Sequence, residues 1–178
     1  MTMFEKLFKK KPLAAIEKQE PSHQPKDVGA FYDQYNDAFL KVYGEVIQAF
    51  RTHDVAQLLD YQIEAMELKP GMKVVDAGCG VCGPAIHFAQ HAGVEVHAVT
   101  ISQEQFNRSK ERVAAAGMED KVFVYLGDYH ELSSILPNTD FDRVYFLESF
   151  GHSPYHYRAI DSAWNVLSSG GLLYIKDL

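Results

Sequence analysis

A glycine-rich loop next to an acidic side chain is the part of this sequence best suited to bind a ligand. Gly78, Gly80 and Gly83 form a G-x-G-x-x-G pattern between a β-rich run and a helical run. Glycines permit a tight turn and let the backbone approach a ligand closely. Asp76 comes just before the first glycine, and a carboxylate at that point suits a cationic ligand better than a pyrophosphate. The loop therefore predicts a site for a nucleotide-like ligand that carries positive charge.

Two positions further along the chain help to separate the candidate ligands. A dinucleotide needs an acid about 20 residues after the loop, at the end of the second strand, to hold its ribose. This chain has Thr100 there. Gly127-Asp128 follows the third β-rich run directly, and the Asp128 carboxylate can accept a hydrogen bond from an adenine amine. The alternative role for Asp128 is a helix cap.

Glu148 and His152 are the candidate catalytic residues. Glu148 ends the fourth β-rich run, and His152 follows four residues later. A carboxylate and an imidazole at this edge of a sheet can act as a base or stabilise a cation. The alternatives are an acid that caps a loop and a histidine that packs in the loop or faces solvent.

Two other patterns have the residue spacing of redox-active cysteines or of metal ligands, and we assign neither redox chemistry nor metal binding to them. Cys79-x-x-Cys82 lies in the glycine loop with no further Cys/His cluster to complete a zinc site. His87 and His91 are four residues apart on a predicted helix and have no third ligand in evidence. The sequence therefore predicts no metal site.

Beyond Pro70 the chain alternates β-rich with helical runs. We expect strands at 73–77, 94–101, 122–126, 141–147 and 172–176, and helices at 84–91, 103–116 and 157–167, with 129–136 a short helix or loop. The last helix has Ile160, Ala163, Trp164 and Leu167 on one apolar face. Strands spaced in this way need right-handed crossovers. The fold class is therefore α/β, a doubly wound, mostly parallel Rossmann-like sheet after N-terminal helices.

The length of 178 residues predicts one domain with a tail. We expect a flexible basic tail at 1–27, a helical lid or substrate region at 28–69 and the ligand-binding core at 70–178. Because the chain stops in its fifth strand, we expect that C-terminal strands are missing. The open edge could also be covered by another chain, as in a homo-oligomer.

The charge and composition of the chain limit the classes of partner that it can bind. The net charge is −7, divided into +3 for residues 1–26 and −10 for the remainder, which argues against nucleic-acid binding. Phe4, Leu7 and Phe8 beside the tail lysines suggest either weak contact with an anionic membrane surface or a frayed tail. No apolar run is long enough for a membrane span and no secretory signal is recognised. With two cysteines, we expect a cytoplasmic, reducing setting.

The layout resembles the class I S-adenosylmethionine-dependent methyltransferases, with residues 74–83 similar to their first motif and Gly127-Asp128 to their acid after the third strand. The resemblance implies S-adenosylmethionine as cofactor in a Rossmann-like core. Family members often hold the ribose with an acid where this chain has Thr100. The implied cofactor residues are Asp76, Gly78, Cys79 and Gly80 around methionine and ribose, Thr100, Ser102 or Gln105 at the ribose, and Asp128 with Tyr129 at the adenine.

A narrower resemblance lies within that superfamily. Residues 68–81 and 144–154 are similar to the sterol C-methyltransferase core, and 99–102 to cyclopropane-fatty-acid synthases and prenyl-diphosphate C-methyltransferases. This implies C-methylation of a small, apolar, isoprenoid or lipid-like acceptor. The aromatic segment of the sterol enzymes has little counterpart in residues 42–45. The alternatives are N- or O-methylation of a small metabolite, an NAD-binding oxidoreductase, or a non-catalytic ligand-binding protein.

Overall fold

The fold is organised around a parallel five-stranded sheet. A computed structural model describes residues 21–46 and 54–177. The strand order is β3-β2-β1-β4-β5, and every neighbouring pair is parallel. The strands are β1 Lys73–Ala77, β2 Glu95–Thr100, β3 Val122–Leu126, β4 Phe141–Leu147 and β5 Leu167–Lys176. The predicted α/β fold class is confirmed, because β2 and β3 follow one another on one side of β1, and β4 and β5 follow one another on the other side.

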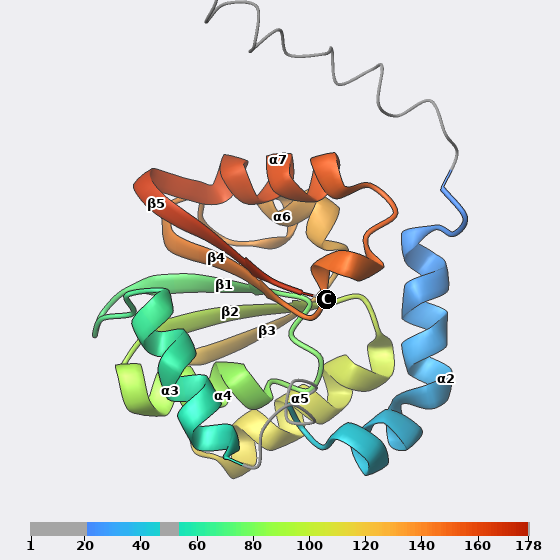
Figure 1. The fold of residues 1–178 in the computed structure, drawn as a ribbon, viewed down its shortest axis with the longest axis horizontal. Coiled ribbons are helices and arrows are strands. Elements are labelled where there is room, and N and C mark those ends of the chain that lie inside the picture. Colours follow the sequence, from blue (N-terminus) through green and yellow to red (C-terminus); the bar gives the residue numbers. More distant parts are fainter. Residues whose placement is uncertain (1–20, 47–53, 178) are drawn as a thin grey trace, which may run out of the picture.

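Helices cover both faces of the sheet (Figure 1). One face carries α3, α4 and α5, and the opposite face carries α6 and α7 (Figure 1). The bounds are α3 Val55–Ala65, α4 Gly83–Ala92, α5 Gln103–Ala115, α6 Leu132–Ile135 and α7 His156–Val166, with short 3-10 helices η3 Tyr129–Glu131 and η4 Phe150–His152. Segment 129–136, expected to be a short helix or a loop, is thus η3 followed by α6.

Two apolar layers hold the helices on the sheet. Adjacent residues of β1 point to opposite faces, so Val74 packs in the layer with Phe88 of α4, and Val75 packs in the layer with Ala163 of α7. Both faces of β1 are buried from Val74 onward, which explains why Val74, Val75 and Ala77 do not alternate with exposed polar residues. Packing of the two layers sets the positions of the strand ends. The loops that follow these ends carry the candidate site residues.

Helix α2, Pro25–Tyr43, stands beside the carboxyl ends of the strands and packs along α5 (Figure 1). Pro25 occupies the first helical turn, where a missing N–H costs nothing, and Gln24 with Asp27 forms a capping box. The helix thus begins two residues before the expected end of the tail at residue 27. Tail residues 1–20, including the stripe Phe4, Leu7 and Phe8, lie outside the described residues.

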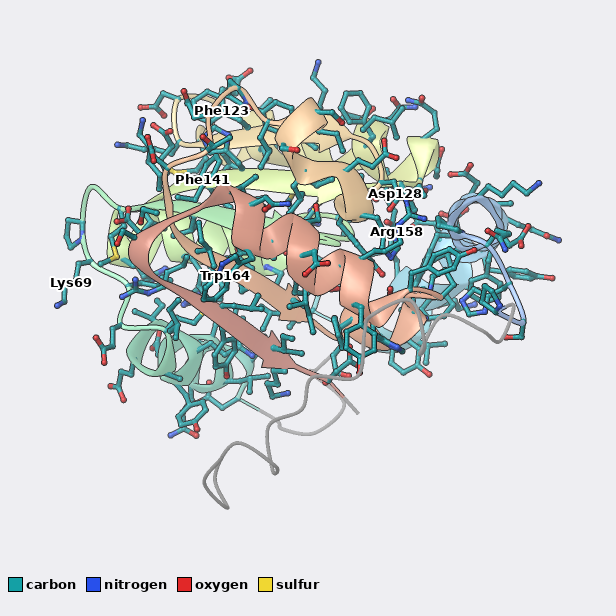
Figure 2. The ribbon with its side chains drawn as sticks, turned by 90° about the horizontal axis from the view of Figure 1, so that it is seen from above. Lys69, Phe123, Asp128, Phe141, Arg158 and Trp164 are labelled. Atoms are coloured by element: carbon teal, nitrogen blue, oxygen red, sulfur yellow. The ribbon has the colours of Figure 1, made fainter. Side chains whose placement is uncertain are left out.

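Two details differ from the predictions. Strand β5 starts at Leu167, which pairs with Phe141, five residues before the expected start. Trp164 does not belong to the apolar face of α7: it is 69% exposed, on the side of the molecule seen in Figure 2. The small side chains Ala159 and Ala163 face the sheet instead, because they let α7 approach the strands closely.

β5 is an edge strand of the described sheet, paired with β4 on one side. Leu172 and Ile175 are exposed along it. Among the described residues, no helix is long and apolar enough to cross a membrane.

Candidate functional site

A cavity lies between the carboxyl ends of β1, β2 and β4 on one side and helix α2 on the other. A smaller cavity adjoins it at the end of β3 and shares Tyr129 and His152 with it. The larger cavity brings together nine of the predicted site residues: Asp76, Gly78, Cys79, Gly80, Thr100, Gln105, Tyr129, Glu148 and His152. Asp128 lines the smaller cavity, and Ser102 lines neither of the two.

The glycine loop is shaped by a close approach from the loop after β4. Gly78 has φ +97°, and a Cβ atom there would lie 2.5 Å from the Cβ of Ser149. The Ser149 hydroxyl donates to the Ala77 carbonyl at 2.6 Å. The backbone amides of Gly78 and Cys79 both donate to the Val99 carbonyl, so these two N–H groups are already hydrogen-bonded within the protein. Glycine is therefore needed at position 78 for packing as well as for backbone conformation.

Asp76 places a buried carboxyl group at the floor of the cavity. The residue is 2% exposed. Burial raises the pKa of this carboxyl from 3.8 to about 7, and interaction with the Tyr145 hydroxyl acts in the opposite direction. A buried carboxylate is stable when a cation lies next to it. The environment of Asp76 therefore favours a positively charged ligand.

At the end of β2, the hydroxyl groups expected to replace an acid are engaged within the protein. Thr100 Oγ1 donates to Gln105 Oε1 at 2.8 Å. Ser102 caps α5 by accepting from the Gln105 amide, and its hydroxyl donates to Asp33 of α2 at 2.6 Å. The structure thus gives Ser102 a capping and docking role, away from the cavity lining, because a side chain at an N-cap turns back to its own helix.

Asp128 both caps η3 and faces the smaller cavity. Its Oδ1 accepts from the His130 backbone at 3.0 Å and lies 2.5 Å from Nδ1 of the His130 ring. Burial alone raises the pKa of Asp128, but the His130 hydrogen bonds, with the charges of His130 and Arg158, outweigh it and lower the pKa below 3.8. Figure 2 shows Asp128 and Arg158 near each other beside α7. The carboxylate is thus held charged at the end of β3.

Glu148 is buried in the left-handed backbone region, with φ +55°. Its amide donates to the Lys176 carbonyl at 2.9 Å, and its carboxylate lies 3.4 Å from Lys176 Nζ. Non-glycine residues in this conformation carry a strain of about 1–3 kcal/mol, and such strain gathers at functional sites. The conformation directs the loop after β4 across the strand ends, so that both Glu148 and His152 line the cavity.

His152 meets helix α2 across the cavity. Its Nε2 lies 3.0 Å from the hydroxyl of Tyr32, and the two rings meet edge to face. Burial and the charge of Asp177 raise the pKa of Tyr32 to about 12, so the phenol stays protonated at neutral pH. Tyr32 therefore lies at the site, whereas Tyr35 is 44% exposed on the same helix.

Three acidic side chains of the α2 region dock it onto α5. Asp33 accepts from Ser102 and the Glu104 amide, Asp37 pairs with Arg108 at 2.5 Å, and Glu45 pairs with Arg112.

A close contact continues this docking to the glycine loop. A Cβ at Gly83 would lie 2.3 Å from the Glu45 carbonyl, so only glycine admits this segment beside the start of α4. Arg112 also donates to the Val81 carbonyl at 2.8 Å. Residues 44–46 and the glycine loop are thus linked through one side chain.

Sequence reasoning missed several residues that the fold brings to the site: Asn36, Arg112, His130 and Ser149. His130 lies two residues after the predicted acid, and Ser149 lies within the 144–154 motif, next to Glu148. Asn36 and Arg112 carry no local pattern, because their contacts are with segments distant in the sequence. Within residues 21–46 and 54–177, no three His, Cys, Asp or Glu side chains are grouped to hold a metal ion.

The chain matches the family described as mycolic acid cyclopropane synthetase over residues 20–178. It is 31% identical over 161 residues to 27-O-demethylrifamycin SV methyltransferase of Amycolatopsis mediterranei (strain S699), covering 86% of this chain and 58% of that protein. It is 28% identical to 24-methylenesterol C-methyltransferase 2 of Oryza sativa subsp. japonica, covering 96% and 48%. The chain thus spans between about half and three fifths of the length of these relatives.

Solved structures share the fold. The [4+2]-cyclase SpnF aligns with a TM-score of 0.76 at 22% identity, over 88% of this chain and 61% of that one. Geranyl diphosphate methyltransferase in complex with S-adenosylmethionine aligns with a TM-score of 0.59 at 22% identity, over 66% and 47%. These likenesses show the architecture alone. Because the family match extends over all of the described residues, the chain belongs to the mycolic acid cyclopropane synthetase family.

Proposed function

We propose that this chain carries the donor site and part of the acceptor site of an S-adenosylmethionine-dependent methyltransferase. The observation that supports it best is a single cavity lined by Asp76 and the glycine loop together with Glu148 and His152. A methyl transfer needs donor and acceptor aligned in one enclosure that excludes water. The relatives named as methyltransferases agree with this reading.

The residues present fit S-adenosylmethionine. Asp76 offers a desolvated carboxyl group to the positively charged methionine end. Asp128, held as a carboxylate by His130, can accept from the adenine amine, next to the Tyr129 ring in the smaller cavity. When bound, the donor supplies a methyl group on a positively charged sulfur. No acid lies at the end of β2, which argues against a nicotinamide cofactor.

The apolar lining of the cavity favours carbon methylation of an isoprenoid or lipid-like acceptor. Phe39, Leu40 and Val46 line it from the α2 side, and Leu147 lines it from β4. Methyl addition to an alkene leaves positive charge on the acceptor. The Glu148 carboxylate can stabilise that charge, and His152 can take the proton whose loss completes the reaction.

Oxygen methylation is the second candidate. A relative at 31% identity is named for a 27-O-demethylated substrate. The His152 imidazole, 3.0 Å from the Tyr32 hydroxyl, is placed to accept a proton from an acceptor hydroxyl as well. The two candidates differ in the acceptor and use the same donor site.

Three further proposals concern the compartment of the protein, its association with a second copy and its contact with a membrane surface. Cys79 and Cys82 are both free and buried, which supports a reducing, cytoplasmic compartment. Association with a second copy of the chain is a proposal from the sequence. Contact of the basic tail with an anionic membrane surface remains a proposal from the sequence.

Calorimetric titration with S-adenosylhomocysteine tests the donor site, with NADH as competitor. We expect micromolar binding that NADH does not displace and that both Asp76→Ala and Asp128→Ala weaken at least tenfold. Transfer of a labelled methyl group to prenyl diphosphates, sterols and hydroxylated macrolides then separates carbon from oxygen acceptors. A folded protein that does not bind S-adenosylhomocysteine would contradict the proposal.

A further inference from the structure

A tyrosine in the middle of β4 buries a hydroxyl group that has no hydrogen-bond partner. Tyr145 is fully buried, and its hydroxyl is unpartnered among residues 21–46 and 54–177. The ring packs edge to face on Phe88 of α4, with 5.6 Å between the ring centroids, so it is held in place. Buried polar groups nearly always have a partner, since an unsatisfied one costs free energy. An acceptor next to this hydroxyl would remove that cost.

The pairing of the strands places Tyr145 beside the carboxyl group at the floor of the cavity. Asp76 and Tyr145 are register partners on the parallel strands β1 and β4. Asp76 lies two residues after Val74 and so points to the same face of the sheet. Tyr145 packs in the same apolar layer as Val74, the layer that α4 covers. Because neighbouring strands are about 4.8 Å apart, the side chains of Asp76 and Tyr145 lie side by side.

The two groups are close without forming a hydrogen bond. Burial raises the pKa of Asp76 to about 7, and interaction with the Tyr145 hydroxyl lowers it. Burial, followed by the charge of Asp76, holds the pKa of Tyr145 well above its ordinary value, so the phenol keeps its proton and can donate it to a hydrogen bond. A carboxylate accepts such a bond more strongly than a protonated acid does. Asp76 is therefore the acceptor that the hydroxyl can use once the carboxyl group ionises.

The other neighbours of Asp76 do little to stabilise its charge. Its register partner on β2 is Ala98, which has no polar side chain. From the glycine loop, the Cys79 thiol faces Asp76, and interaction with Cys82 together with burial holds the pKa of that thiol well above its ordinary value. The thiol is thus neutral. Among the described residues, Tyr145 supplies the side-chain hydrogen-bonding group that lowers the pKa of Asp76.

We propose that Tyr145 is a positioning residue for the methyl donor: its hydroxyl donates to Asp76 and holds that side chain as a carboxylate facing the ammonium group of the donor. The inference rests on the proposed donor site. Tyr145 acts through Asp76, since it lies beneath the cavity and does not line it. The hydroxyl makes ionisation of Asp76 easier, and an ionised Asp76 binds a cationic group more tightly.

The test is the pH dependence of S-adenosylhomocysteine binding, measured by calorimetry from pH 6 to pH 9. Tyr145→Phe removes one oxygen atom and keeps the ring that packs on Phe88. We expect binding to be about tenfold weaker at pH 6, the effect of one hydrogen bond to a charged group. At pH 9, where Asp76 is ionised in both proteins, we expect nearly equal binding. The rise of affinity with pH should thus move upward by about one pH unit.

Two controls accompany this variant. Tyr174→Phe removes a hydroxyl from the register partner of Tyr145 on β5, and it should leave the pH profile unchanged. In an Asp76→Asn background, Tyr145→Phe should have the same effect at every pH, because no carboxyl group remains to be ionised. The ammonium group of the ligand titrates identically with every protein, so the ratio of affinities at each pH reports on the protein alone.

The melting temperature of the free protein supplies a readout apart from binding. The folded-state pKa of Asp76 is raised, so stability declines as pH rises toward and through about 7, and it declines further without the hydroxyl. Relative to the parent, Tyr145→Phe should therefore melt at the same or a higher temperature at pH 5, where it only removes an unsatisfied group. At pH 9 it should melt at a lower temperature.

The outcomes separate this inference from the proposed function. If the parent protein does not bind S-adenosylhomocysteine at any pH, the donor site itself is wrong. If the parent binds and Tyr145→Phe has the same pH profile, the donor site stands and the role of Tyr145 is wrong. Equal weakening at pH 6 and pH 9 would also overturn it, since the hydroxyl would then act on packing and not on the ionisation of Asp76.

Discussion

The ring of His130 lies 2.5 Å from Oδ1 of Asp128 through Nδ1, and its other nitrogen lies 2.7 Å from the hydroxyl of Ser153. This chain of contacts joins the loop after β3 to the loop after β4. The acid expected at the adenine is therefore positioned by a residue on the loop that also carries His152. The proposed donor site and the loop that carries His152 are linked through one buried imidazole.

Replacing His130 with Phe keeps a ring of similar size and removes both hydrogen bonds. We expect the pKa of Asp128 to rise toward its ordinary value and the affinity for S-adenosylhomocysteine to fall about tenfold. Because the folded-state pKa of Asp128 is lowered, its stabilising effect is present above about pH 4 and is lost at lower pH. His130→Phe should therefore lower the melting temperature more at pH 7 than at pH 3. The exposed variant His91→Phe is the control, and equal effects at both pH values would contradict the expectation.

The raised pKa of Asp76 predicts that donor binding depends on pH. In the free protein this carboxyl keeps its proton up to about pH 7, and the ammonium group of S-adenosylhomocysteine, whose sulfur is uncharged, favours the carboxylate. Affinity for S-adenosylhomocysteine should rise from pH 6 to pH 8, with proton release on binding below pH 7. Calorimetry in buffers of different ionisation enthalpy measures that release. Asp76→Asn should remove both the release and the pH dependence.

Asp76 also affects the free protein. Its folded-state pKa is raised, so its contribution to stability is greatest at acid pH and declines as pH rises from about 4 toward 7. Asp76→Asn cannot ionise, and it should therefore stabilise the free protein relative to the parent at pH 8 but not at pH 4. Urea unfolding at the two pH values checks this sign. A variant equally stabilised at both values would show that burial of the charge is not the cause.

Backbone strain at Glu148 predicts a variant that is more stable and less active. Glycine relieves the left-handed conformation at φ +55°, so Glu148→Gly should gain about 1 kcal/mol, or about 2–4 °C in melting temperature. Loss of the carboxylate should reduce methyl transfer at least a hundredfold. Glu67→Gly is the matched control, since Glu67 is exposed with φ +51°. It should gain similar stability and keep its activity, and a similar loss of activity in both variants would refute the role of Glu148.

Arg112 connects residues 44–46 to the glycine loop, so we expect its side chain to limit local opening of residues 44–46. Arg112→Met keeps the aliphatic stem and removes the bonds to Glu45 and the Val81 carbonyl. We expect faster amide hydrogen exchange at the end of α2 and S-adenosylhomocysteine binding weakened about threefold to tenfold, as for one charge-assisted hydrogen bond to a partly exposed group. Lys110→Met, on the exposed side of α5, should change neither. Unchanged exchange in Arg112→Met would mean that the close contact at Gly83 suffices by itself.

Local patterns in the sequence predict most of the framework of this protein. The bounds of β1, β3 and β4 are confirmed as predicted, because short local runs rich in β-branched and aromatic residues mark these strands. The glycine loop and the acids at strand ends follow from the same local order, since parallel strands bring their carboxyl ends to one edge. These features depend on neighbours in the chain, and so a single sequence reveals them.

Contacts between side chains from distant segments depend on the tertiary structure. Tyr32 and His152 are 120 residues apart in the chain and in hydrogen-bond contact. Ser102 was expected at the ligand and instead docks α2, while Trp164 was expected in the core and lies at the surface. The unpartnered hydroxyl of Tyr145 has no signal in its own strand, because whether a polar group is satisfied depends on what packs against it. Local pattern specifies strands and loops, and the burial of polar groups is known only once distant segments are in place.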